Sequence, residues 1–288
     1  MKKLRSILAT LITLLAVIIY VVFFLDNKAP EPEQTPDGEL IVTFIDVGQG
    51  DSELIQQNEN AILIDSGEYN QRKKLINKLN ELGVSSLDYV IATHPHSDHM
   101  GCMNVVIDTY DTRHAMMPNV ASTTVSFEKM LESIASRGLK IERPTPGKAI
   151  TAGNIKLEIL APNAEKYKDV NDYSVVTRLT WGQTSFLFTG DAEALSEKEI
   201  LGKGFAVSAD VLNLGHHGSV SSTSKNFLEE VNPQMAVISC GQGNTYGHPH
   251  AETMQKLSEK GIPVYRTDTM GTITMYSDGI EITVKTEK

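Results

Sequence analysis

The sequence predicts an α/β fold in which two β-sheets pack together and helices lie outside them. Between residues 40 and 288, short runs rich in β-branched residues end at Gly, Asn or Asp, as hairpin strands do. Later runs of the same kind alternate with segments whose apolar residues recur at helical spacing, which is typical of βα units. Hairpins mixed with βα units favour two packed layers of sheet with outer helices.

The expected elements follow in chain order. Strands are predicted at 40–47, 52–56 and 61–65, a helix at 69–82 that ends at Gly83, and a strand at 87–93. A helix at 123–136 precedes strands at 155–160, 175–181 and 185–189. The last part reads as a helix ending near 201, a strand at 210–214, a helix at 222–230, a strand at 234–239, a helix at 251–260, and strands at 264–266, 271–276 and 280–285.

A hydrophobic segment near the N-terminus predicts a membrane anchor. Three basic residues among the first five precede an almost unbroken apolar run, Ile7–Leu25. As a helix this run would be about 28 Å long, close to the hydrocarbon thickness of a bilayer. A cleaved signal peptide is the alternative, but its apolar core is usually shorter, and no small-residue cleavage site follows Leu25. Residues 1–25 are therefore expected to form a transmembrane signal anchor.

Residues 26–39 contain three prolines and several acids, a composition typical of a solvated linker, so the globular domain is expected to span residues 40–288. Because the basic residues precede the apolar run, the positive-inside rule places a single-pass protein in the cell membrane with this domain extracytoplasmic. Secretion is the alternative if the segment is cleaved.

The net charge of −10, from 26 basic and 36 acidic side chains, gives no support to a broad grip on nucleic acid, which normally needs a basic face. A metal site acting on a phosphodiester remains compatible with this charge, because the ion supplies local positive charge. Cys102 and Cys240 lie far apart and specify neither a disulfide framework nor a structural zinc site.

The strongest functional signal is H-P-H-S-D-H at residues 94–99, directly after a buried strand. Imidazole and carboxylate suit zinc, with manganese or iron as alternatives. In an extended segment His94 and His96 lie on the same side and can reach one ion. Asp98 and His99 then turn toward a neighbouring position for a second ion. The alternative is a cluster of exposed loop histidines. Four candidate ligands directly after one buried strand argue against it.

Three more candidates lie at later strand ends. Asp191 follows an apolar strand through Gly190, and a carboxylate there can bridge two cations. The pair His216-His217 follows the strand at 210–214 and is flanked by glycines. Functional groups gather beyond the carboxyl ends of strands, so these clusters favour one shared site.

His248 and His250 follow another strand, within Y-G-H-P-H. For each later histidine, simple packing or solvation is the alternative interpretation. His114, isolated in the chain, is expected to be structural or exposed.

These motifs together resemble the metallo-β-lactamase superfamily. F-I-D-V-G-Q-G-D-S at residues 44–52 is similar to the opening of the ComEC-type hydrolase domain, which is attached to bacterial competence DNA-uptake channels and also occurs as secreted proteins. N-D-Y-S-V-V, F-L-F-T-G-D, G-H-H-G-S and Y-G-H-P-H are similar to the same branch in order and approximate spacing. The resemblance covers about residues 40–285 and implies an αββα sandwich with a metal site along one edge of the sheets.

The resemblance also implies roles for particular residues. One or two divalent ions, zinc or alternatively manganese, are expected on His94, His96, Asp98, His99, Asp191 and His217. Asp191 would bridge them, and His248 would be a further ligand or a donor to an oxyanion. Asp65 is expected to hydrogen-bond a ligand histidine or a loop. Asp46 and Asp51 are expected to order the loop over the site rather than to touch metal.

Two features depart from the family pattern. No histidine stands between His114 and His216 to act as the usual third ligand of the first metal, and the ComEC-type resemblance implies that residues 171–174 occupy its position. Cys102 follows Gly101 where the family usually has a second glycine.

The expected chemistry is attack of an activated water on phosphorus or a carbonyl carbon, with Asp98 orienting or deprotonating the water and His216 or His248 assisting the oxyanion or leaving group. The favoured function is an extracytoplasmic phosphodiesterase acting on nucleic acid or on an envelope phosphate ester such as phosphorylcholine on teichoic acid. The alternatives are a β-lactamase, thioesterase or lactonase, and a non-enzymatic accessory of a DNA-uptake or envelope complex.

Overall fold

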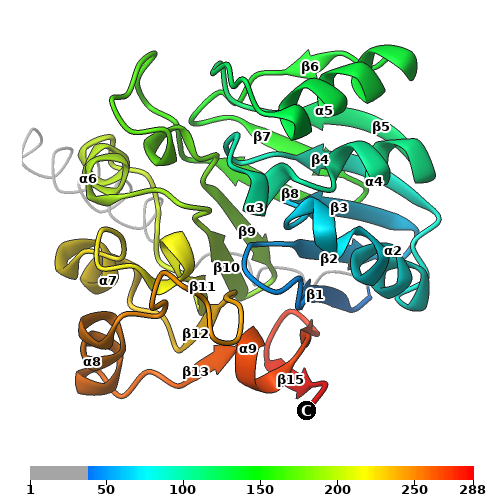
Figure 1. Cartoon of the computed structure of the whole chain (residues 1–288). Coiled ribbons are helices and arrows are strands. Elements are labelled where there is room, and N and C mark those ends of the chain that lie inside the picture. The colour runs from blue at the N-terminus through cyan, green and yellow to red at the C-terminus, as the bar shows by residue number, and fades with distance from the viewer. Residues whose placement is uncertain (1–37) are drawn as a thin grey trace, which may run out of the picture. The chain divides into compact units, whose positions relative to one another are not determined.

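Eight strands form the first sheet of the computed structural model, which describes residues 38–288 (Figure 1). Its spatial order is β15 (Ile282–Thr286), β14 (Ile273–Ser277), β1 (Leu40–Phe44), β2 (Glu53–Gln57), β3 (Asn60–Ile64), β4 (Ser86–Ile91), β5 (Asp111–Met116) and β6 (Ile141–Glu142). The strands from β15 to β3 pair antiparallel, whereas β3 to β6 run parallel.

The second sheet has seven strands and a similar division. Its order is β13 (Val264–Arg266), β12 (Met235–Ile238), β11 (Val211–Asn213), β10 (Thr184–Phe188), β9 (Thr177–Trp181), β8 (Ile155–Ile159) and β7 (Ala149–Ala152). The strands β10 to β13 run parallel, so their carboxyl ends meet at one edge.

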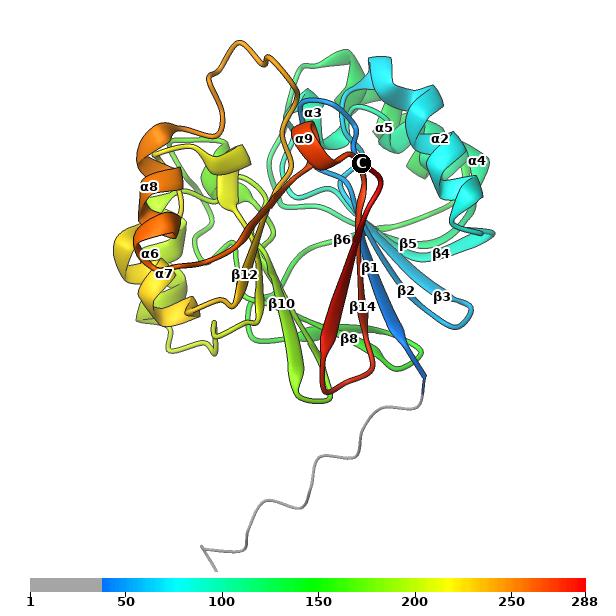
Figure 2. The same ribbon diagram turned by 90° about the horizontal axis from the view of Figure 1, so that it is seen from below.

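The two sheets pack face to face, and Figure 2 shows them between two groups of helices. The core between them contains fully buried side chains from both sheets, among them Phe44, Phe186 and Phe188. A second cluster packs α2 (Arg72–Glu81), α4 (Met103–Thr109) and α5 (Val125–Ser136) on the first sheet. A third packs α6 (Ala194–Gly202), α7 (Lys225–Val231) and α8 (Ala251–Glu259) on the second. The αββα expectation is confirmed.

The anchor expected at residues 1–25 and almost all of the linker lie outside the described residues. Within residues 38–288, no helix combines the length and the apolar character needed to cross a bilayer.

Most predicted elements occur within a few residues of their expected bounds, and the differences have local causes. The helix at 69–82 begins as a short 3₁₀ turn, η1 (Tyr69–Gln71), before α2. The helix expected from residue 222 begins at Lys225, because the Ser224 hydroxyl caps it by accepting from the Phe227 amide. The sequence patterns did not indicate α4, β5, β6 or β7. β5 is D-T-R-H-A-M, too polar for a strand pattern, and its place in the sheet comes from parallel pairing with β4.

The loop between β1 and β2 packs directly on the short helix α3 (Ser97–Met100). The Asp51 amide donates to the Asp98 carbonyl oxygen at 3.2 Å, and Gly50 has φ +130°. A Cβ at Gly50 would lie 2.1 Å from that same oxygen. This glycine therefore lets the loop approach the histidine-rich segment as closely as the structure requires.

Gly50→Ala is expected to lower the free energy of unfolding by about 3 kcal/mol or more, because strained backbone and overpacking each cost about 1–3 kcal/mol. Urea denaturation measures this change. Gly138→Ala is the matched control: its φ is +66°, but no atom lies within 4 Å of the added Cβ, so only the left-handed backbone cost of about 1–2 kcal/mol applies. Equal losses in the two variants would contradict a specific role for the contact with Asp98.

Candidate metal centre

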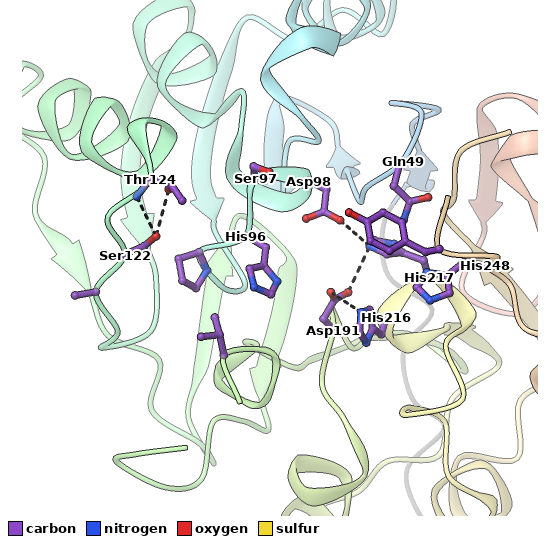
Figure 3. Close-up of a pocket in the computed structure, with 14 residues that line it drawn as sticks. Gln49, His96, Ser97, Asp98, Ser122, Thr124, Asp191, His216, His217 and His248 are labelled. Carbon is purple, nitrogen blue, oxygen red and sulfur yellow. Dashed lines mark hydrogen bonds and ion pairs between the residues drawn. The ribbon is translucent and has the colours of Figure 1, made fainter. Parts of the chain in front are cut away.

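The buried carboxylate of Asp191 lies among imidazoles that come from both sheets (Figure 3). Its Oδ1 is 3.1 Å from Nε2 of His99 and 3.7 Å from Nε2 of His217. Its Oδ2 is 3.6 Å from Nε2 of His94. Each of these histidines directs the nitrogen remote from its backbone toward one carboxylate, as metal ligands around a bridging group do.

The strand ends deliver these side chains to one edge of the sandwich. His94 and His96 lie between β4 and α3, and His99 lies in α3 itself. Asp191 follows β10, and His217 lies in η3 (Gly215–Gly218), which follows the adjacent strand β11. The carboxyl ends of parallel strands from two sheets therefore supply the site, in line with the general rule for α/β sheets.

Two groups of side chains have ligand atoms close enough to share an ion, all within 4.8 Å of one another. One group is His94, His96 and Asp191, and the other is Asp51, His99, Asp191 and His217. Asp98 adjoins the second group, because its Oδ2 is 3.3 Å from Nε2 of His217. Asp191 belongs to both groups and can bridge two ions.

The state of the buried polar atoms fits a divalent ion. Nε2 of His99 and Oδ1 of Asp191 are both buried and make no hydrogen bond to the described residues, although they lie 3.1 Å apart. Buried polar atoms are normally satisfied. Two that face each other without a hydrogen bond are expected where a cation is coordinated by both.

The opposite nitrogens of these imidazoles are held by other groups. Nδ1 of His99 lies 2.7 Å from the Asp65 carboxylate, which also accepts from the Thr93 amide at 2.8 Å and the Thr93 hydroxyl at 2.6 Å. Nδ1 of His217 lies 2.9 Å from the Ser239 carbonyl oxygen. Such partners fix the tautomer and the ring orientation of a ligand histidine. Asp65 occupies the supporting position expected of it.

The backbone at the site is strained. His216 and His217 have φ of +52° and +54°, and Asp65 has φ of +53°. Non-glycine residues in this region cost of order 1–3 kcal/mol each and persist where the surroundings impose them. Half of the six such residues that occur in the described part of the chain are at this centre.

The segment at 171–174 does lie beside the first group. The Ser174 hydroxyl is 3.3 Å from Nδ1 of His94 and accepts from the Asp191 amide at 3.1 Å. Within residues 38–288 no third imidazole joins His94 and His96 in a group that could hold an ion. The departure noted in the sequence therefore persists in the folded protein.

A family model described as the metallo-beta-lactamase superfamily matches residues 45–242, more than half of the chain. The chain belongs to this superfamily. ComE operon protein 3 of Bacillus subtilis is 32% identical over 260 residues, which cover 84% of this chain and 33% of that protein. The chain thus spans about a third of the length of this curated relative. The similarity agrees with the ComEC-type resemblance.

Two solved structures show the fold at low sequence identity. The metallo-beta-lactamase fold protein YhfI from Bacillus subtilis has a TM-score of 0.57 at 15% identity and covers 84% of this chain and all of its own. A diphosphatase from the PhnP family has a TM-score of 0.50 at 14% identity, covering 83% of this chain and 98% of its own.

In this superfamily member the metal centre opens into a cleft of about 400 Å³. Figure 3 shows the candidate ligands and two further histidines along one side of it: His96, Asp98, Asp191, His216, His217 and His248. Gln49, Ser122, Thr124 and the exposed Tyr246 contribute to the remaining wall. The volume is within the range of small-molecule sites.

His216 and His248 both line this cleft, whereas His114 and His250 do not. Nε2 of His216 is 3.7 Å from Oδ2 of Asp191, and its Nδ1 is 3.2 Å from Glu193. His250 instead accepts from the Val220 amide at 3.0 Å, a structural role. His114 is half exposed and pairs with Glu142 at 2.6 Å, as expected of a surface residue.

The two acids of the loop before β2 have different surroundings. Asp46 accepts from the Gly48 amide at 3.0 Å and pairs with Lys74 at 2.7 Å, so it orders the loop as expected. Asp51 is fully buried and belongs to the second candidate ligand group, where the sequence had not placed it. Cys102 and Cys240 are free and buried, and burial raises both thiol pKa values to about 12.

The ionisable groups of this centre shift one another's pKa values strongly. Burial disfavours ionisation of Asp191, but His99 and His217 outweigh it and hold the pKa of this carboxyl well below its usual range. Burial likewise opposes protonation of the two histidines, yet Asp191 and further carboxylates raise the pKa of His99 and of His217 well above the usual value. Protons therefore compete with metal for these imidazoles.

The purified full-length protein is expected to bind one to two equivalents of zinc or manganese. Binding should tighten as the pH rises from about 6 to about 8, because His99 and His217 must release the protons that their raised pKa values retain. Elemental analysis and equilibrium dialysis measure the stoichiometry and the affinity. A protein that contains no metal and gains no thermal stability on adding either ion would contradict the assignment of this centre.

Proposed function

We propose that the chain is a metal-dependent phosphodiesterase. The observation that carries this proposal is the sharing of Asp191 by two candidate ligand groups that open together into the cleft. Two ions bridged by a carboxylate suit the in-line displacement of a phosphoester, and when bound they would polarise the ester and lower the pKa of water. At the level of fold, the diphosphatase neighbour supports chemistry at phosphorus.

The metal ligands in this proposal are His94, His96, Asp98, His99, Asp191 and His217. Asp98 has a further task, because its carboxylate is less buried than that of Asp191 and lines the cleft. It can orient the attacking water and accept its proton.

His248 serves as an uncharged hydrogen-bond donor. Burial, followed by the neighbouring His217 and His216, lowers the pKa of His248 to about 4, so its ring is neutral near pH 7. Its Nδ1 is buried and makes no hydrogen bond within residues 38–288. A neutral ring that lines the cleft can stabilise developing negative charge on the substrate. His216, oriented by Glu193, is then the residue that assists the leaving group.

The cleft favours a small or terminal phosphodiester over a long polyanion. No Lys or Arg occurs among the described residues that line it. The negative charge of the substrate must then be met at the metal centre itself, which suits an ester with one charged phosphate. An envelope phosphate ester such as phosphorylcholine on teichoic acid fits this environment, and the end of a nucleic acid strand is the second candidate. The similarity to ComE operon protein 3, which agrees with the ComEC-type resemblance to a domain of DNA-uptake channels, supports the second candidate.

The native enzyme is expected to hydrolyse bis-(p-nitrophenyl) phosphate faster than p-nitrophenyl phosphate or a β-lactam. Asp191→Ala should abolish this activity and lower metal content, because one carboxylate serves both ligand groups. Chromogenic assays and elemental analysis give the two readouts. Full diesterase activity in Asp191→Ala would refute the two-metal mechanism, and hydrolysis of β-lactams or thioesters alone would favour the rival class of hydrolase.

His248→Ala separates a donor from a ligand in the same assay. A donor role predicts nearly normal metal content with turnover reduced by about 10²–10³-fold, the usual loss when one oxyanion donor is removed. Loss of metal from this variant would make His248 a ligand instead.

We also propose that the domain acts outside the cytoplasm on a single N-terminal membrane anchor. The support is the basic N-terminus followed by the apolar run Ile7–Leu25. Protease added to intact cells or protoplasts is then expected to digest the domain, and the protein should fractionate with membranes. A shortened soluble form as the main species in the medium would favour a cleaved signal peptide.

A further inference from the structure

The side chain of Asp51 is buried without a hydrogen bond. The residue is 1% exposed, and neither carboxylate oxygen has a hydrogen-bond partner among the described residues. Its backbone, by contrast, is fixed on both sides: the amide donates to the Asp98 carbonyl oxygen at 3.2 Å, and the carbonyl oxygen accepts from the Gly67 amide at 2.9 Å. The loop therefore holds the carboxylate in one place.

A buried carboxylate in this state is costly unless a positive charge lies beside it. The nearest candidate is Nδ1 of His217, at 3.3 Å from Oδ1. That nitrogen is already 2.9 Å from the Ser239 carbonyl oxygen, which is better placed to accept its proton. His217 therefore satisfies the Asp51 carboxylate only in part.

The surroundings of Asp51 point to a metal ion as the remaining partner. A carboxylate oxygen of Asp51 lies within 4.8 Å of ligand atoms of His99, Asp191 and His217. Asp65 provides the contrast: it is equally buried, but its carboxylate is saturated by Thr93 and His99. Asp65 supports a ligand from behind, whereas Asp51 has both oxygens available at the centre.

We propose that Asp51 is a further carboxylate of the metal centre, where it compensates the charge of the ion held by His99, Asp191 and His217. Asp51 lies next to His217, and its negative charge adds to that of Asp98. This role concerns metal binding and stands whichever ester is the substrate.

The test compares Asp51→Asn, which removes the charge at nearly constant volume, with the wild-type full-length protein. Isothermal titration of the metal-free protein with zinc or manganese measures affinity, and thermal unfolding is recorded with and without the ion. Affinity is expected to fall by about 10–100-fold, the usual loss when a group that supports a metal site is removed. The melting temperature without metal should stay the same or rise, since the variant no longer buries a poorly satisfied charge.

Two further variants calibrate this result. Asp46→Asn lies in the same loop, away from the candidate ligands, and should leave metal affinity unchanged. Asp65→Asn should lower affinity and also the stability of the metal-free protein, because its carboxylate accepts hydrogen bonds from Thr93. A metal affinity for Asp51→Asn within about twofold of wild type would overturn the proposal and make Asp51 a structural residue.

If Asp51→Asn does not fold, the proposal can still be tested on the wild-type protein. Crystals grown with manganese would locate each ion by its anomalous signal. The proposal requires the Asp51 carboxylate to face an ion directly or through one water. A carboxylate turned away from every ion would overturn it.

Discussion

Opposite charges packed at the junction of two sheets determine how this site is built. Asp191 comes from the second sheet, whereas His99 comes from the first, and both are buried at the same edge. Ionised groups in such a place are stable only with partners close by. The edge can therefore form only when both sheets are docked with their strand ends aligned, so the hydrophobic core between the sheets and the polar site above it depend on each other.

The loops of the site contribute unfavourably to the free energy of folding, and burial of apolar side chains elsewhere in the fold offsets this contribution. Left-handed backbone at His216, His217 and Asp65 and the buried charge of Asp51 oppose folding. Three hydrophobic clusters, one between the sheets and one under each layer of helices, oppose that cost. An ion bound by the folded protein but not by the unfolded chain adds to their effect.

The sequence was informative where chemistry and periodicity coincide. The ligand types at 94–99, 191 and 216–217 follow apolar strands, so their meeting at one edge could be predicted from strand polarity alone. The strand β5 could not be predicted from the sequence, because its residues are polar and they form a strand only by pairing with β4. Asp46 and Asp51 are alike in sequence context, because they flank Gly48 and Gly50 on opposite sides. Only the folded loop turns one toward Lys74 and the other toward His217.

The two candidate ligand groups are unequal, and this inequality has a functional consequence. His94, His96 and Asp191 form a group with a single carboxylate and an exposed member, His96, which also borders the cleft. The group around His99 and His217 is fully buried and richer in carboxylates. Charge and burial favour tighter binding in the buried group. The exposed group lacks a third imidazole, so an oxygen of the substrate or of water could complete the ligand set of an ion bound there. An incomplete ligand set at the cleft is therefore consistent with an active hydrolase, since catalytic metal sites keep an open position.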